Sequence, residues 1–168
     1  MTKLFLTGFL FTLCFGFAKA QNDERRSFSN TFSLGVEPSL PIGLFGQVYG
    51  YGIGASAQEN MEIDKHLALT INAGYINYYL RSTYGGGSNG YIPVLGGAEM
   101  SFSHSIFVSI QSGITFRTQG LGNAFTYSPG VGFRIRKNFT ALLKYIGQTR
   151  SAINSSSVGL RVAYVFGK

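Results

Sequence analysis

Apolar and polar side chains alternate with a period of two along most of the chain after residue 30. In Ile106–Arg117 the even positions are mostly apolar, whereas the odd positions are mostly polar or small. Phe125–Arg136 and Ser157–Phe166 repeat this alternation. A period of two over such lengths is typical of β-strands with one apolar face and one polar face. The chain is therefore expected to be all-β.

Weaker versions of the same pattern bring the number of candidate strands to eight. These weaker candidates are Thr31–Pro38, Tyr51–Gln58, Leu67–Tyr79, Tyr91–Phe102 and Phe139–Gly147. Most of the eight are longer than the five or six residues that are usual for strands in soluble proteins. A strand of about ten residues, tilted by about 40°, rises about 25 Å, which is the height of the apolar band on a membrane barrel.

The connections between the candidate strands alternate in kind. The longer ones are rich in Gly, Ser and Asn, and they are Ser39–Gly50, Leu80–Gly90, Thr118–Ala124 and Gln148–Ser156. The shorter turns between them are Glu59–His66, Ser103–Ser105 and Lys137–Asn138, of which the first is rather long and charged. Short turns at one rim and longer loops at the other are expected of outer-membrane barrels. We expect both termini in the periplasm and the four longer connections outside.

Alternation alone also fits a soluble lipocalin-like barrel, so other features must decide. Charged residues make up only 12% of the chain, about half of the content typical of soluble proteins. Aromatic residues mark the outer end of the apolar face (Tyr51, Tyr79, Phe116, Phe125, Tyr127, Tyr145) and its inner end (Phe32, Phe102, Phe139, Tyr164, Phe166). The chain lacks Trp, and with it the Gly-x-Trp signature of lipocalins. Because open sheet edges cannot face lipid, the last strand is expected to pair with the first.

Residues 1–20 are interpreted as a cleavable signal peptide. Lys3 provides a positive start, Leu4–Phe17 is almost wholly apolar, and Ala18-Lys19-Ala20 is a small-x-small cleavage pattern. The apolar stretch is shorter than the roughly 17–25 residues that a membrane-spanning helix needs. Leu13 before Cys14 does not fit a lipoprotein signal. We expect residues 21–168 to be exported to the outer membrane of a Gram-negative cell as one barrel domain.

Several glycine- and aromatic-rich stretches resemble the small outer-membrane β-barrel family typical of Bacteroidetes, which is related to OmpA/OmpX-type barrels. They are Leu34–Gly43, Tyr49–Gly54 and Tyr91–Gly97. The last strand looks like the C-terminal signal that the barrel-assembly machinery reads, although Gly167 and Lys168 follow its terminal aromatic Phe166. The resemblance implies an eight-stranded antiparallel up-and-down transmembrane β-barrel in contact with outer-membrane lipids and lipopolysaccharide. It implies no single activity, because barrels of this kind serve many functions.

The charged residues inside the candidate strands all fall on the polar phase, which faces the lumen of a membrane barrel. They are Glu37, Glu99, Arg117, Arg134, Arg136, Lys144 and Arg161. An eight-stranded barrel is just wide enough to be filled by side chains, so charges there must be paired or solvated. We expect a structural network of Glu37, Glu99, Arg117, Arg134, Lys144 and Arg161 that plugs the lumen, with Glu37 within reach of Arg161 or Lys144. The excess of cations leaves an anion-preferring channel as the alternative.

No set of residues predicts catalysis, a cofactor or a metal site. The pair His104-Ser105 could suggest a lipid A deacylase, but it falls at the inner rim, and adjacent strand residues point to opposite faces. Gly50-x-Gly52-x-Gly54 lacks the following helix that a phosphate-binding loop requires. These glycines are instead interpreted as leaving room in a narrow lumen. His66 also falls in a turn, and the dispersed basic residues argue against nucleic-acid binding.

The sequence therefore favours a monomeric outer-membrane barrel with a structural or surface-interaction role and a surface ligand that it does not identify. The alternatives are a small anion-preferring channel, a secretion or transport accessory, a lipid-modifying enzyme and a soluble lipocalin-like binder.

Overall fold

The computed structural model describes residues 30–119, 122–150 and 153–166. The signal peptide expected at residues 1–20 lies outside the described residues. None of the described helices is long and apolar enough to cross a membrane.

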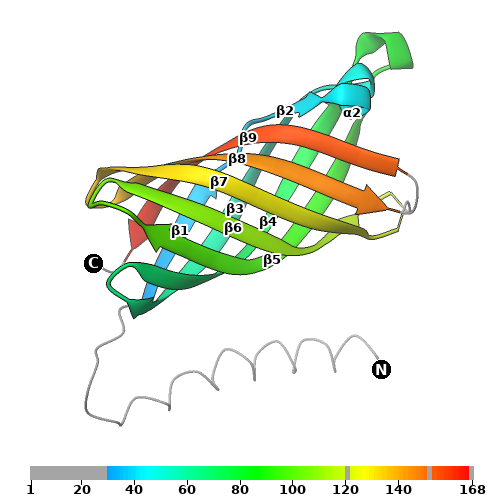
Figure 1. The fold of residues 1–168 in the computed structure, drawn as a ribbon. Helices are drawn as coiled ribbons and strands as arrows, with labels where there is room; N and C mark the ends of the chain where they lie inside the picture. The colour runs from blue at the N-terminus through cyan, green and yellow to red at the C-terminus, as the bar shows by residue number, and fades with distance from the viewer. Residues whose placement is uncertain (1–29, 120–121, 151–152, 167–168) are drawn as a thin grey trace, which may run out of the picture.

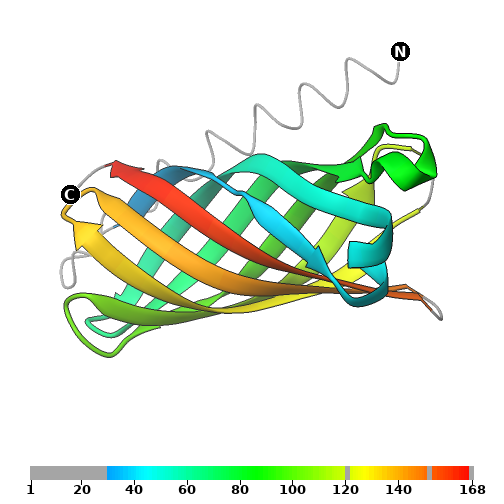
Figure 2. The ribbon, with the colours of Figure 1, turned by 90° about the horizontal axis from the view of Figure 1, so that it is seen from above.

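The described residues form one closed antiparallel sheet (Figures 1 and 2). Its strands are β1 (Asn30–Val36), β2 (Ser39–Ile42), β3 (Tyr49–Asp64), β4 (Leu67–Leu80), β5 (Ser88–Ser101), β6 (Ile106–Arg117), β7 (Ala124–Arg136), β8 (Phe139–Arg150) and β9 (Ile153–Phe166). β1 and β2 are two halves of one strand, because both pair with β3 on one side and with β9 on the other. Each later strand pairs with its neighbour in the chain. The expected eight-stranded up-and-down barrel is confirmed.

The two ends of the barrel differ in what they carry. One end, here called the terminal rim, holds the described chain ends, since Phe32 of β1 pairs with Phe166 of β9. The other end, the loop rim, carries α2 (Gly43–Val48) and the short 3-10 helix η2 (Ser82–Tyr84). In Figure 1 the terminal rim lies to the left and α2 lies near the opposite end.

The alternation expected of β6 is present in the structure. Phe107, Ser109, Gln111 and Thr115 are buried in the lumen, whereas Ile110 is 68% exposed on the outside. The other strands repeat this arrangement, with polar side chains inside and large apolar side chains outside. A soluble barrel has the opposite polarity, so the lipocalin-like alternative is wrong.

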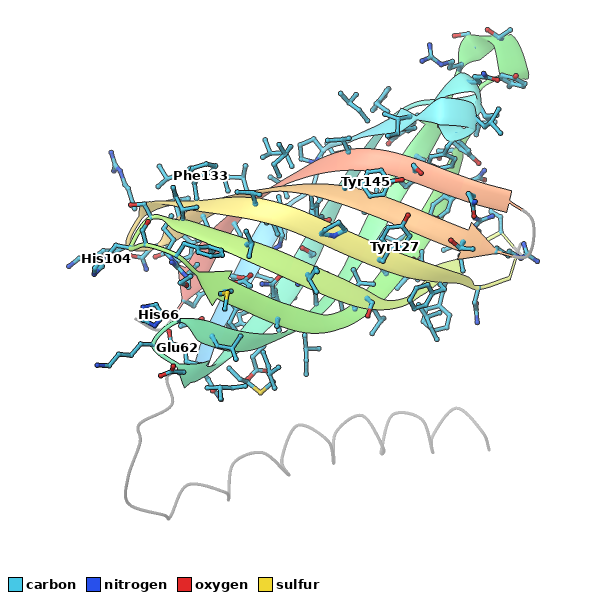
Figure 3. All side chains as sticks on the ribbon, viewed as in Figure 1. Glu62, His66, His104, Tyr127, Phe133 and Tyr145 are labelled. Atoms are coloured by element: carbon cyan, nitrogen blue, oxygen red, sulfur yellow. The ribbon has the colours of Figure 1, made fainter. Side chains whose placement is uncertain are left out.

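Aromatic side chains surround the outside of the barrel near both rims, as expected. Phe32 and Phe166 pack together at the terminal rim with ring centroids 6.1 Å apart. Tyr127 and Tyr145 lie side by side on the outer surface nearer the loop rim, with centroids 5.9 Å apart (Figure 3). Phe133 points outward closer to the terminal rim (Figure 3). Such aromatic girdles match the two interfaces of a bilayer.

Four expected connections are instead partly regular structure. Leu80–Gly90 contains η2 and the first residues of β5. The expected turn Glu59–His66 is largely strand, because β3 continues to Asp64, where it pairs with Leu67 of β4. Its charged residues lie at and beyond the aromatic girdle, where water can reach them. The expected loop Gln148–Ser156 is mostly hairpin, since Gln148 pairs with Ser155. The expected loop Ser39–Gly50 contains β2 and α2.

Candidate functional site

The lumen is closed near the loop rim by a cluster of aromatic rings, here called the aromatic cap. Phe45 of α2 packs against three inward-facing tyrosines. Its ring centroid lies 4.6 Å from that of Tyr49, 5.0 Å from Tyr78 and 6.1 Å from Tyr91. The three tyrosines are buried. Arg117 adds a guanidinium 5.3 Å from the centroid of the Tyr91 ring.

Two glycines allow α2 to place Phe45 over these tyrosines. Gly43 has φ of +59°, a left-handed conformation that residues with a side chain rarely adopt, and it turns the chain out of β2 into α2. At Gly46, a Cβ atom would lie 2.6 Å from the Pro41 carbonyl oxygen, so any side chain there would push the helix off β2. The loop sequence thus determines where Phe45 lies.

Beneath the aromatic cap lies a buried ion cluster of Glu37, Lys144 and Arg161. The Glu37 carboxylate lies 2.9 Å from Lys144 Nζ and 3.5 Å from Arg161 Nε. Ser56 donates a hydrogen bond to Glu37 and accepts one of 2.8 Å from Arg161 Nε. Arg161 Nη2 also donates to the backbone and side-chain oxygens of Ser33, at 3.3 and 3.0 Å. The cluster therefore joins β8 and β9 to β1 and β3 across the closure of the barrel.

Uncharged side chains form the next layer toward the terminal rim. Gln111 Nε2 donates to Gln58 Oε1 at 3.2 Å and to Thr70 Oγ1 at 3.1 Å. Asn72 Nδ2 also donates to Gln58 Oε1, at 3.2 Å. Gln58 Nε2 in turn donates to Glu99 Oε1 at 2.9 Å. This amide layer lies between the ion cluster and the open end of the lumen at the terminal rim.

Below the amide layer the lumen widens into a cavity of about 560 Å³, here called the vestibule. Its walls include Asn60, Glu62, Glu99 and Arg134, and the turn residues His66 and His104 line its mouth. Figure 3 shows Glu62, His66 and His104 together at this end of the barrel. The lumen is thus open at the terminal rim and filled toward the loop rim.

The six residues expected to form one network occupy three places. Glu37, Lys144 and Arg161 form the ion cluster, with both expected cations in contact with Glu37. Arg117 lies against the aromatic cap. Glu99 and Arg134 line the vestibule.

Glu99 and Arg134 do not form an ion pair. Arg134 lies over the Phe107 ring, 5.0 Å from its centroid, and donates a hydrogen bond of 2.8 Å to Ser101 Oγ. The charges in the lumen are therefore less connected than the sequence suggested. Arg136, also on the inward phase, lies exposed at the terminal rim.

The aromatic cap was missed from the sequence, although one signal was available. Tyr78 and Tyr91 fall on the inward phase near the loop rim, where an open pore would carry small or polar residues. What closes over them could not be read from the pattern, because Phe45 belongs to a segment interpreted as an irregular loop.

The two histidines stay apart from any catalytic or metal-binding group in the described part of the chain. His66 and His104 are exposed in separate turns at the terminal rim. Ser105, next to His104, is exposed too. Within the described ranges, no three His, Cys, Asp or Glu side chains are grouped so as to hold a metal ion.

Comparisons with known proteins identify the fold of the chain. No family model matches the chain, and no curated protein matches it significantly. The crystal structure of Ail, the attachment invasion locus protein of Yersinia pestis, superposes with a TM-score of 0.58 at 13% identity, covering 84% of this chain and 100% of Ail. The N-terminal β-barrel domain of Pseudomonas aeruginosa OprF gives 0.59 at 12% identity, covering 83% of this chain and 99% of that domain.

A designed transmembrane β-barrel is also similar, with a TM-score of 0.54 at 14% identity over 83% of this chain and 98% of the design. The fold is that of the small transmembrane β-barrels. At such identities the likeness concerns the backbone, so the contents of the lumen must be interpreted from this chain's own residues.

The filled lumen predicts that the barrel does not conduct ions. Purified folded protein in a planar bilayer is expected to show no steady channels. Phe45→Ala is expected to stay closed as well, because the ion cluster and the amide layer remain beneath the aromatic cap. Steady wild-type currents that disappear in Arg134→Ala and Arg161→Ala would instead support the anion-preferring channel.

Proposed function

We propose that this protein is an integral outer-membrane barrel that acts at the cell surface by binding anionic groups at its loop rim. The exposed apolar outer surface between two aromatic girdles supports insertion into a bilayer. The barrel would lie with its terminal rim in the periplasm. The filled lumen argues against transport through the barrel, so the ends of the barrel are where it can act.

The observation that carries this proposal is the charge distribution between the two rims. The loop rim has the cations Arg81, Arg117 and Arg150, and no Asp or Glu occurs in any of the four connections at that end. Arg81 and Arg150 are exposed, and Arg117 is half-buried. The terminal rim, in contrast, carries Glu62 and Asp64 beside its cations. A surface with cations and no carboxylates attracts anions.

Lipopolysaccharide is the first ligand to expect, because its phosphate groups are the anions nearest to the outer rim of such a barrel. Sulfated glycans have the same chemistry. Ail, which shares the fold, has been crystallised in complex with the heparin analogue sucrose octasulfate. The proposal extends binding of such polyanions to the loop rim of this chain, on the strength of its own arginines.

The proposal also includes a monomeric barrel of the small group typical of Bacteroidetes, with a last strand recognised by the barrel-assembly machinery. These points rest on the sequence resemblance and on the shared fold.

Neutralising two loop-rim arginines is expected to weaken polyanion binding. Each exposed ionic contact contributes up to about 1 kcal/mol, so Arg81→Gln combined with Arg150→Gln should lower affinity for lipopolysaccharide about three- to tenfold. Surface plasmon resonance on protein in nanodiscs measures this, and the wild-type affinity should fall with added salt.

Arg136→Gln provides the matched control, because Arg136 is equally exposed at the opposite rim. Its affinity for lipopolysaccharide is expected to equal that of the wild type. Equal losses in both variants, or wild-type binding in the loop-rim double variant, would refute an anion-binding loop rim.

A further inference from the structure

The geometry of the vestibule points to a second binding site, at the opposite end from the proposed surface site. We propose that the vestibule binds a small organic cation carrying a primary ammonium group, held between the carboxylates of Glu62 and Glu99. The site would be filled from the terminal rim, which is the only side on which the described lumen is open.

Strand register places Glu62 and Glu99 in one row across the sheet, with Ala68 between them. Glu62 of β3 pairs with Ala68 of β4, and Ala68 pairs with Glu99 of β5. All three residues line the vestibule. Since neighbouring strands lie about 4.8 Å apart, the outer two backbones of this row are about 10 Å apart. Ala68 between them adds only a methyl group to the wall of the vestibule.

Glu99 is buried without a counter-ion. It is only 5% exposed, and no Lys or Arg nitrogen of the described chain lies within 4.0 Å of its carboxylate. Gln58 donates to one oxygen at 2.9 Å and Asn60 to the other at 3.0 Å. Two donors leave about half of the acceptor positions of a carboxylate unused. A buried charge in this condition favours a cationic ligand.

A second buried group beside Glu99 also lacks a partner. Ser109 of β6 pairs with Glu99 in the same row and is 3% exposed. Its hydroxyl has no hydrogen-bond partner among the described residues. An ammonium group has three donors and no acceptor. It can therefore serve Glu99 and Glu62 and leave one donor for water. Ser109 does not line the vestibule, so its hydroxyl is not a ligand contact.

The cations that line the vestibule do not form ion pairs with these carboxylates. Arg161 is held in the ion cluster by Glu37 and Ser56. Arg134 is held over Phe107 and on Ser101. Lys65 lies in the exposed turn at the mouth, where it forms no ion pair with a described residue. The carboxylates of Glu62, Asp64 and Glu99 therefore stay without a close cation.

The size of the cavity suits a small molecule. A volume of about 560 Å³ lies within the range of about 300–1,000 Å³ typical of ligand pockets. Most of the residues that line it are polar or charged, which favours a hydrophilic amine over a lipid. Putrescine, a diamine with four methylene groups, is a suitable probe, and 1,4-butanediol is its neutral counterpart.

Isothermal titration calorimetry with the folded protein in detergent micelles tests the proposal. Putrescine is expected to bind to the wild type, whereas 1,4-butanediol and the dianion succinate are not. Glu99→Gln should lower the affinity for putrescine at least tenfold, and Ala68→Leu, which enlarges the side chain between Glu62 and Glu99, should abolish binding. Glu59→Gln is the matched control, because Glu59 lies on the same strand but faces outward.

Gel mobility before and after boiling verifies that each variant is folded, and Glu62→Gln replaces Glu99→Gln if the latter fails to fold. Absence of putrescine binding to the wild type would overturn the proposal. So would equal affinity in Ala68→Leu, or binding of succinate as tight as that of putrescine. Loss of binding in Glu59→Gln would place the amine outside the vestibule and would likewise contradict the proposed site.

Discussion

Replacing Glu37 by Gln is expected to lower the free energy of unfolding by about 3–5 kcal/mol, because removing one partner leaves buried charges uncompensated. Lys144 and Arg161 are 4% and 3% exposed, and Glu37 is the one carboxylate of the described chain within 4.0 Å of either. The amide of Gln is neutral, so it cannot balance the two cations. The lost stability should mainly affect the pairing of the last strands with the first, because the ion cluster joins them.

Urea unfolding in detergent micelles, followed by far-UV circular dichroism, measures the effect of Glu37→Gln. Tryptophan fluorescence is not an option, because the chain has no Trp. Glu59→Gln is the control, since Glu59 is exposed and pairs with Phe32 at the terminal rim. It should change the free energy of unfolding by less than about 1 kcal/mol. A Glu37→Gln barrel as stable as the control would show that the ion cluster does not hold the closure.

A second test uses a double variant to isolate the ion pair between Glu37 and Lys144. In the double variant Glu37→Gln/Lys144→Met, one of the uncompensated cations is gone, so part of the stability lost in Glu37→Gln should return. The interaction energy between the two positions then measures the buried ion pair itself. Independent, additive losses would contradict the pairing seen between Glu37 and Lys144.

Gly97→Ala is expected to destabilise the barrel by at least about 2 kcal/mol, as overpacking of a tight contact does. A Cβ atom at Gly97 would overlap the Ile110 carbonyl oxygen and lie 2.7 Å from the Gln111 Cα atom. Both atoms belong to the backbone of β6, so no side-chain rotation can relieve the contact. β5 and β6 would have to separate, which breaks their ladder.

Gly96→Ala is the matched control for Gly97→Ala. Gly96 precedes Gly97 on β5 but faces outward, and a Cβ atom there would meet nothing closer than 3.9 Å. Its stability should equal that of the wild type within about 0.5 kcal/mol. The wild type and the two alanine variants are compared by the temperature to which each must be heated before its band shifts on an SDS gel. Equal behaviour of the two alanine variants would show that β5 and β6 are not closely packed at Gly97.

The alternation of side chains predicted most of the barrel because lipid and lumen act on opposite faces of every strand. β6 and β7 were predicted with nearly their observed bounds, since each face of these strands is uniform in polarity. The aromatic girdles were predicted from the same alternation. Glu37 was placed near Lys144 and Arg161 because strand order and height along the strand are enough to estimate distance across a small lumen.

The features that the sequence did not predict depend on contacts between distant segments. Phe45 lies in a short helix and packs against Tyr78 and Tyr91, which are more than 30 residues away along the chain. The extension of β3 to Asp64 was missed because Glu59 interrupts the apolar outward face, although a strand that leaves the bilayer is free to carry charged residues. Glu99 was expected to pair with a cation, but the amide side chains of Gln58 and Asn60 donate hydrogen bonds to its carboxylate instead.

The break in the first strand has a consequence for the speed of assembly. From β3 to β9, each strand pairs with the next strand along the chain, so these hairpins can form with little loss of chain entropy. The junction of β1 and β2 with β9 joins the two ends, as in the contact of Arg161 with Ser33, 128 residues apart. Pro38 accepts a hydrogen bond from Leu160 there but has no N–H to return. Pairing across so long a separation is slow, so this junction is expected to form last and, when the barrel unfolds, to open first.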